Sequence, residues 1–161
     1  MNNLIEIFED ILRCSDTVNY IPAVVFDIDG TIIMDDHSYF DMSTIIDSVY
    51  NFYQYLQKRG DIRIFVITAR AYKNFESTND PYYLEVLDML NKINCYPDKL
   101  DLWSYSKYAD VTTYKKEKRR ELWNQNYNIL MSLGDNVWDY GEFGGLGVHI
   151  HNDGEKIDII L

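Results

Sequence analysis

Two aspartates one residue apart are the side chains in this sequence best suited to chemistry. Asp27 and Asp29 follow the apolar run 23–26 and precede Gly30. Side chains at positions i and i+2 of a strand point to the same side, so the two carboxylates start out aimed at one place. Carboxylates held that close repel each other unless a cation lies between them. We therefore expect a nucleophile and an acid/base gathered around a divalent metal ion.

Polar residues also follow two further apolar runs. Thr68 ends the run 62–68, and Asp135 comes shortly after the run 128–133. In open α/β sheets, ligands bind outside the carboxyl ends of the strands. We therefore expect Asp27, Thr68 and Asp135 to meet at one edge of a sheet.

The spacing of apolar residues predicts alternating strands and helices. Helices are expected over 3–13, 43–58, 81–93 and 113–125, and strands over 23–28, 62–68, 100–103 and 128–133. The glycine-rich segment 141–147 is expected to be a loop, and 148–150 with 157–161 either a terminal hairpin or a fifth strand plus an extension. Because strands that alternate with helices pair in parallel, we predict an α/β fold. Its expected form is a three-layer α/β/α Rossmann-like sandwich with a central parallel sheet, built by residues 1–161 as a single domain.

Four segments of the chain resemble, in order, the motifs of the haloacid dehalogenase (HAD) superfamily of phosphohydrolases. They are Asp27-Ile28-Asp29-Gly30-Thr31, Ile67-Thr68-Ala69-Arg70, the basic run that contains Lys115, and Gly134-Asp135-Asn136-Val137-Trp138-Asp139. The resemblance is nearest to the acid-phosphatase-like branch. It implies a HAD-like fold and a Mg²⁺-dependent phosphomonoester hydrolase that works through an aspartyl-phosphate intermediate.

The resemblance also implies roles for the matching residues. Asp27 would be the nucleophile and Asp29 the general acid/base. Thr68 and Lys115 would hold the phosphoryl oxygens. Mg²⁺ would be bound by Asp27, the backbone carbonyl of Asp29, and Asp135, since hard oxygen ligands suit this ion. An aspartate at position 29 marks phosphatases and phosphotransferases rather than dehalogenases or ion pumps.

Several polar residues near these motifs have open roles. Asp139 is suited to bind the metal through water, to orient Lys115 or to cap a loop, and Asn136 to contact the metal directly or through a ligand. Arg70 is equally suited to contact substrate and to form a surface salt bridge. The basic cluster around Lys115 has a solvated face as its simplest explanation, and Lys116 is the alternative site lysine.

Three histidines lie outside the motifs. His149 and His151 share a strand face by spacing, as metal-binding pairs do. No cysteine or histidine cluster completes such a site in the sequence, so a structural or surface role is favoured. His37 lies with Asp35, Asp36 and Asp41 in the acidic loop after the first motif. We expect this loop to be a solvated flap, with a role in shaping the entrance as the alternative.

Composition narrows the class of protein. The 161 residues are 47% hydrophobic, which predicts a folded globular chain, and the net charge of −11 disfavours nucleic-acid and anionic membrane partners. Cys14 and Cys95 fit reduced thiols in a reducing compartment. The acidic N-terminus does not resemble a signal peptide, and no apolar run has the length of a membrane span. We therefore expect a cytoplasmic protein, with an oligomer possible.

The intervals between the motifs are short. The expected elements fill both 31–68 and 70–115, which predicts no substantial cap domain over the site. The leading hypothesis is a Mg²⁺-dependent phosphomonoesterase acting on a phosphorylated substrate of unknown class. The alternatives are a nucleotide or polynucleotide-end phosphatase, and a HAD-fold binding or regulatory module with weak catalysis.

Overall fold

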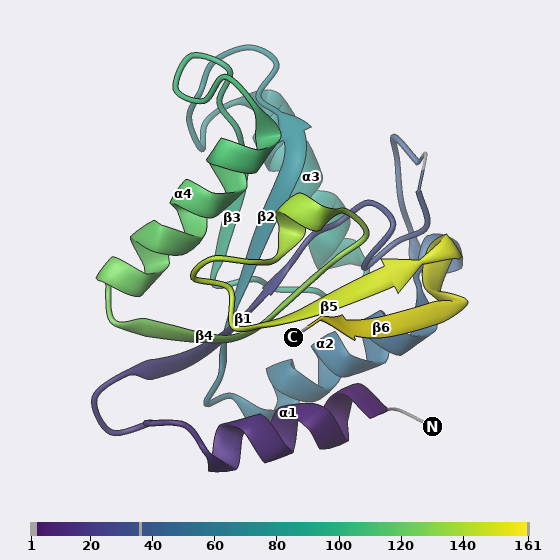
Figure 1. Ribbon diagram of the computed structural model, residues 1–161. Coiled ribbons are helices and arrows are strands. Elements are labelled where there is room, and N and C mark those ends of the chain that lie inside the picture. Colours follow the sequence, from purple (N-terminus) through teal and green to yellow (C-terminus); the bar gives the residue numbers. More distant parts are fainter. Residues whose placement is uncertain (1–2, 36, 161) are drawn as a thin grey trace.

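Strands and helices alternate along the chain in the computed structural model, which describes residues 3–35 and 37–160 (Figure 1). The helices are α1 (Asn3–Arg13), α2 (Asp47–Arg59), α3 (Pro81–Lys92) and α4 (Val111–Asn124). The strands are β1 (Ile21–Phe26), β2 (Arg63–Ala71), β3 (Lys99–Trp103), β4 (Tyr127–Gly134), β5 (Leu146–His151) and β6 (Lys156–Ile160). Short 3-10 helices are η1 (Met42–Thr44), η2 (Val137–Asp139) and η3 (Asn152–Gly154).

The strands form one mostly parallel sheet in the order β3-β2-β1-β4-β5-β6. The pairs from β3 to β5 are parallel, and β6 returns antiparallel along β5. The chain builds the sheet outward in one direction from β1 to β3 and then in the other direction from β4. Strands β1 and β4 therefore flank a topological switch point, where α/β folds bind ligands beside the carboxyl ends of the strands.

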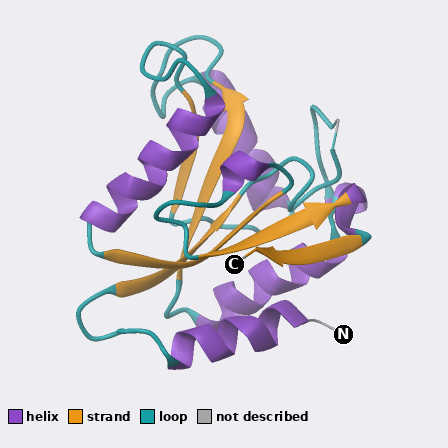
Figure 2. Cartoon of the chain, in the orientation of Figure 1, coloured by secondary structure: helices purple, strands orange, loops and turns teal. Residues whose placement is uncertain are grey.

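Helices cover both faces of the sheet, which confirms the predicted three-layer α/β/α sandwich (Figure 2). Val24 and Phe26 of β1 belong to a core shared with α1, α2 and α3. The alternate residues Ala23 and Val25 belong to a second core with Tyr114 and Leu122 of α4. This division follows from the two-residue period of a strand, which sends successive side chains to opposite faces.

The ends of three helices are set by local residues. Asp80 caps α3, accepting a hydrogen bond from the Tyr82 amide at 3.1 Å, and Pro81 occupies the first turn as predicted. Gly60, with φ of 78°, ends α2. Helix α4 begins two residues before the predicted start, because Asp110 provides its cap.

Three predicted boundaries were wrong. The helix expected over 43–58 is divided into η1 and α2, because Ile46 has an extended backbone that interrupts the helical run. The first strand ends at Phe26 rather than at residue 28, and β2 continues past Thr68 to Ala71. Asp27 and Asp29 therefore lie in the loop after β1, and Thr68 lies within its strand.

The C-terminal segment combines the two arrangements expected for it. Strand β5 is a fifth parallel strand beside β4, and β6 forms a hairpin with β5. The glycine-rich loop ends two residues earlier than predicted, since β5 begins at Leu146. Leu161, which was expected to close the last strand, lies outside the described residues.

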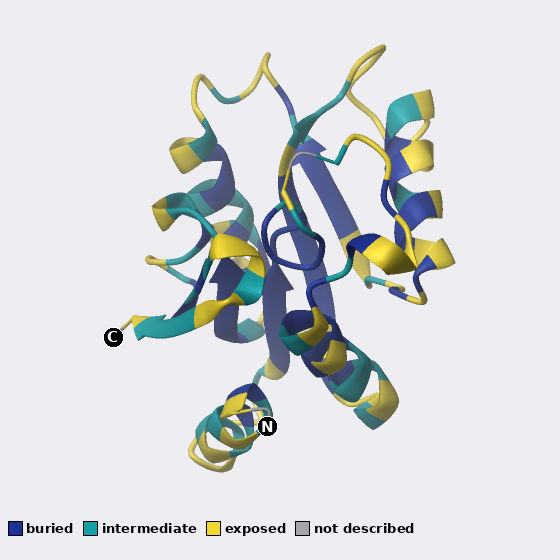
Figure 3. Ribbon diagram, turned by 90° about the vertical axis from the view of Figure 1, so that its right-hand side faces the viewer, coloured by how far each residue is buried: buried dark blue, intermediate teal, exposed yellow. Residues whose placement is uncertain are grey.

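Burial is greatest along the central strands (Figure 3). All residues of β1 except Ile21 are buried, as is the stretch Ile64–Thr68 of β2. Among the described residues, no helix is both long enough and apolar enough to cross a membrane.

Candidate active site

Three carboxylates meet where β1 and β4 end. Asp27 follows β1 directly, while Asp135 and Asp139 follow β4. Their oxygen atoms come within 4.8 Å of one another. Two glycines make this approach possible, because a Cβ on Gly30 would overlap the carboxylate of Asp135 and a Cβ on Gly134 would overlap that of Asp139. The short polar motifs of the sequence thus shape the cluster as well as supply its carboxylates.

The electrostatics of this carboxylate cluster suit a divalent cation. Asp27 is 6% exposed and Asp139 is 3% exposed. Burial, with the nearby charge of Asp139, raises the pKa of Asp27 well above its ordinary value. The same two causes raise the pKa of Asp135 to about 6. A bound cation would offset both effects, and carboxylate oxygens are the ligands that Mg²⁺ prefers. The residues present therefore fit a hard divalent metal ion.

Lys115 contacts two of the three carboxylates of the cluster. Its side chain is 2% exposed, and its Nζ donates to Asp27 Oδ1 at 2.8 Å and also contacts Asp139 Oδ1. Burial alone would lower the pKa of Lys115, but the charges of Asp27 and Asp139 outweigh that effect and raise it. Lys116 points elsewhere, toward Glu142 at 3.0 Å. Geometry thus identifies Lys115, rather than Lys116, as the lysine beside the aspartates.

The segment after β4 is held by its own hydrogen bonds. Asp139 Oδ2 accepts from the backbone amide of Asn136 at 3.0 Å, and the Asn136 side chain donates to Asp135 Oδ1 at 3.1 Å. Asp139 therefore contacts Lys115 with one oxygen and closes the turn with the other. Of the roles considered for Asp139, orienting the lysine and capping the loop both match these contacts.

Asp29 lies apart from the carboxylate cluster and pairs with Arg70. The Arg70 guanidinium donates to both oxygens of Asp29, at 2.8 and 2.9 Å. The Arg70 side chain is only 9% exposed and also donates to the carbonyls of His37 and Ser38. Of the two roles considered for Arg70, the salt bridge is formed, but it is nearly buried and lies at the site.

Thr68 lies one strand away from the aspartates. The residue is fully buried, and its hydroxyl accepts from the backbone amide of Arg70 at 3.1 Å. Since Phe26 pairs with Val66, Thr68 is level with the loop that follows β1. The threonine and Arg70 thus approach the site from the same strand, β2.

Arg119 is a structural residue of the site that sequence reasoning missed. Its buried guanidinium donates to the backbone carbonyls of Trp138 at 3.0 Å, Glu142 at 3.1 Å and Tyr140 at 3.4 Å. It therefore fixes the loop that carries Asp139. The solvated face considered for the basic cluster is wrong for Arg119, whereas Lys115, which the motif singled out, lies beside the aspartates. The four-residue spacing of Arg119 from Lys115 on a helix was the available signal.

A hollow opens beside Asp29. It has a volume of about 360 Å³ and is lined by Asp29, Asp35, His37, Ser38, Ala69 and Arg70. The backbone amide of Asp35 donates to Asp153 of η3 at 3.0 Å, which ties the loop 31–41 to the C-terminal hairpin. The acidic loop therefore borders the hollow, which matches the alternative considered for it, although Asp36 lies outside the described residues.

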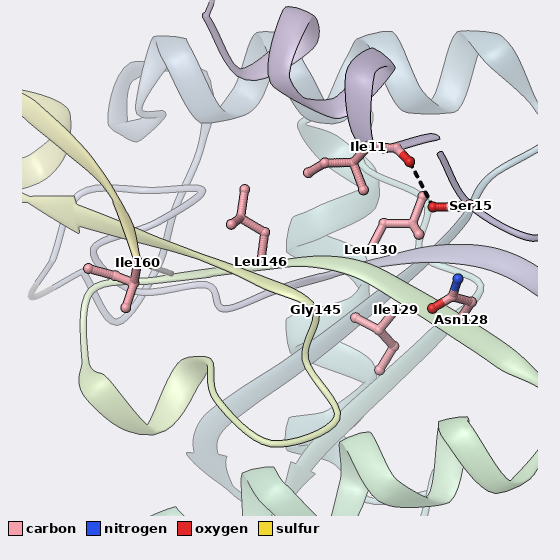
Figure 4. Close-up of a pocket in the computed structure, with 8 residues that line it drawn as sticks. All are labelled: Ile11, Ser15, Asn128, Ile129, Leu130, Gly145, Leu146 and Ile160. Carbon is pink, nitrogen blue, oxygen red and sulfur yellow. Dashed lines mark hydrogen bonds between the residues drawn. The ribbon is translucent and has the colours of Figure 1, made fainter. Parts of the chain in front are cut away.

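A second hollow lies at the opposite edge of the sheet (Figure 4). This apolar groove of about 460 Å³ is lined by Ile129 and Leu130 near the start of β4, by Gly145 and by Ile160. The carboxylate cluster follows the other end of β4. The groove and the cluster are therefore separate features of the molecule.

Comparison with known proteins identifies the family. The model of the family described as "HAD superfamily, subfamily IIIB (Acid phosphatase)" matches residues 41–156, which is most of the chain. The matched stretch contains Thr68, Arg70, Lys115 and Asp135, and it begins after Asp27 and Asp29. A search of curated proteins finds no match.

Proposed function

The chain belongs to the acid phosphatases of HAD subfamily IIIB, which are phosphomonoester hydrolases, and on that premise we propose that Asp27 is its nucleophile and Asp29 its general acid/base. The observation that carries the proposal is the contact between Asp27 and Lys115, at 2.8 Å, inside a buried carboxylate cluster. A lysine there offsets the repulsion between a carboxylate and the phosphoryl group that it attacks.

Mg²⁺ is the metal ion that we propose for the carboxylate cluster. Asp27 and Asp135 would hold it together with the backbone carbonyl of Asp29, and Asp139 adds a further carboxylate nearby. When bound, the ion gathers the carboxylates and neutralises the charge of the phosphoryl oxygens.

The reaction proposed for this site has two steps. In the first, an Asp27 oxygen forms a bond to phosphorus while the bond from phosphorus to the leaving oxygen breaks, and Asp29 gives that oxygen a proton. In the second, Asp29 takes a proton from water, which attacks phosphorus and releases Asp27. Thr68 and Lys115 hold the phosphoryl oxygens throughout.

Arg70 is proposed to position Asp29. Its guanidinium binds both oxygens of that carboxylate, and it is itself held by the carbonyls of His37 and Ser38. A planar guanidinium in a two-point contact fixes the direction of its partner more tightly than an ammonium does. Arg70 therefore sets where the proton is given and taken.

We also propose that the enzyme is a single domain with an open entrance. The hollow beside Asp29 is bordered by the loop 31–41 and by Arg70, with no cap inserted among the described residues between α2 and α4. Such an entrance accommodates large phosphorylated substrates. Activity measurements on a panel of nucleotides, phosphopeptides and 3′-phosphorylated oligonucleotides would identify the chemical class of the substrate.

The test is hydrolysis of p-nitrophenyl phosphate with and without Mg²⁺. We expect Mg²⁺-dependent turnover that Asp27→Asn lowers by a factor of about 10³ or more, because the nucleophile is lost. Asp88→Asn is the matched control, since Asp88 is exposed and pairs only with Lys92 on its own helix among the contacts described. Equal rates for the wild type and Asp27→Asn would instead support a binding module without this catalysis.

A further inference from the structure

His149, His151 and Asp158 form a polar cluster outside the active site. The two histidines lie on one face of β5, and Asp158 lies on β6, the neighbouring strand of the hairpin (Figure 1). The histidine ring centroids are 4.2 Å apart. His151 Nε2 lies 2.8 Å from Asp158 Oδ2, and Asp158 is the direct cross-strand partner of His149. The hairpin thus supplies the third ligand type that the sequence pattern lacked.

The hydroxyl of Tyr140 fixes the orientation of the His149 ring and leaves one ring nitrogen available to bind a metal ion. The Tyr140 hydroxyl lies 2.9 Å from His149 Nδ1, and its ring packs over Gly147, where a Cβ would leave it little room. When Nδ1 donates to this hydroxyl, the lone pair is on Nε2. Histidines that bind metals usually have their other ring nitrogen fixed by such a hydrogen bond.

The charge states of these side chains also suit a cation. Burial, with the neighbouring His151, lowers the pKa of His149, so its ring is neutral near pH 7. The hydrogen bond from His151 lowers the pKa of Asp158, which is therefore ionised. Neutral imidazole and ionised carboxylate are the forms that bind metal.

We propose that His149, His151 and Asp158 bind a transition-metal dication, with Zn²⁺ as the probe. Two imidazoles and one carboxylate form a common zinc ligand set that leaves a fourth position open. The carboxylate cluster of the active site offers only oxygen and so prefers a harder ion. The two sites are therefore selective for different metals.

Metal binding requires rotation of side chains in this cluster. Among the described residues, the active-site carboxylates are the set of three whose ligand atoms already lie within 4.8 Å of one another. Cβ atoms of direct cross-strand partners are about 4.5–5.5 Å apart, so rotation of Asp158 brings its carboxylate within reach of both rings. The ion then takes the place of the His151 Nε2 proton, which moves to Nδ1 of the same ring. It would join β5 to β6 and, through Tyr140, to the loop that carries Asp139.

The experiment is a Zn²⁺ titration of the untagged full chain in excess Mg²⁺, followed by NMR of the histidine rings. The chain has three histidines, so the signals of His37, His149 and His151 can be assigned by single substitutions. We expect the His149 and His151 signals to shift together and saturate at one Zn²⁺ per chain at micromolar concentration. The His37 signal stays in place and is the internal control.

Variants locate the site by calorimetry of Zn²⁺ binding. We expect His151→Ala to abolish the binding, Tyr140→Phe to weaken it by a factor of about 10–100, and His37→Ala to leave it unchanged. Circular dichroism shows whether each variant is folded. No shift at equimolar Zn²⁺, or affinity unchanged in folded His151→Ala, overturns the proposal. Binding lost in Asp135→Asn and kept in His151→Ala also overturns it, because the ion would then occupy the carboxylate cluster.

Discussion

Arg70 binds both carboxylate oxygens of Asp29, at 2.8 and 2.9 Å, in a salt bridge that is nearly closed to solvent on the arginine side. The pair lies beside the hollow at the entrance. The orientation of Asp29, the proposed general acid/base, depends on this contact.

Substitution of Arg70 is therefore expected to slow catalysis more than it weakens binding. We predict that Arg70→Ala lowers kcat for p-nitrophenyl phosphate by a factor of about 10². The reason is that a catalytic group displaced by about 1 Å lowers the reaction rate by about this factor. Arg70→Lys restores charge without the two-point contact and should recover part of the rate. The measurement is kcat and KM at saturating Mg²⁺.

Arg59 provides the control for this prediction. It binds both oxygens of Asp61, each at 2.9 Å, at the far end of α2. Arg59→Ala should leave kcat unchanged. The positioning role of Arg70 fails if the two alanine variants have the same kcat, or if Arg70→Ala changes KM alone.

Lys115 is expected to stabilise the fold as well as serve the reaction. Lys115→Met leaves Asp27 and Asp139 buried without their cation. Loss of one partner from a buried ion pair costs about 3–5 kcal/mol of unfolding free energy. We predict a loss of this size in EDTA and a smaller one in Mg²⁺, measured by urea denaturation.

Lys116→Met tests whether the loss of stability in Lys115→Met comes from the buried position of Lys115 or simply from the loss of a positive charge. The Lys116 side chain is 44% exposed and pairs with Glu142 at the surface. Its replacement should change the unfolding free energy by less than about 1 kcal/mol in either buffer. Equal losses for the two lysine variants would contradict the buried arrangement of Lys115.

The pKa of Asp135 predicts how stability depends on pH without metal. The folded chain holds this proton up to about pH 6, whereas the ordinary value is 3.8. Because the folded state binds the proton more tightly than the unfolded state, this group stabilises the fold at low pH. That contribution is lost as the pH rises from about 4 to about 6.

The measurement compares the wild type with Asp135→Asn in EDTA. The difference in their unfolding free energies should change across this pH range by up to about 1.4 kcal/mol per pH unit. Saturating Mg²⁺ should remove the dependence, since the ion competes with the proton. A difference that is flat in EDTA, or that changes in the opposite direction, contradicts a raised pKa at Asp135.

The order of the elements and the edge that bears the site were predictable from local pattern. The alternating side chains of β1 and the polar residues after β1 and β4 depend only on strand geometry and chain order. The interruption at Ile46 was not predictable in this way, because the apolar spacing of residues 43–58 continues across it. The extension of β2 past Thr68 likewise depends on pairing of Ala71 with Trp103.

The features of the site that could not be predicted from the sequence pattern depend on contacts between distant segments. Asp29 meets Arg70 because β1 and β2 are neighbours, and Asp139 joins the carboxylate cluster because the loop after β4 turns back over Gly134. Asp158 reaches the histidines only through the register of the last hairpin. Most of these side chains could be predicted as site residues from residue type and spacing. Their contact partners depend on the tertiary fold.

The most direct test of the account is where the phosphoryl group resides during turnover. Acid quenching of the enzyme with radiolabelled substrate and Mg²⁺, followed by peptide mapping, locates the covalent label. The account predicts label on the peptide that contains Asp27, retained in Asp29→Asn and absent in Asp27→Asn. Label on another residue, or active turnover with Asp27→Asn, would contradict the assignment of Asp27 as the nucleophile.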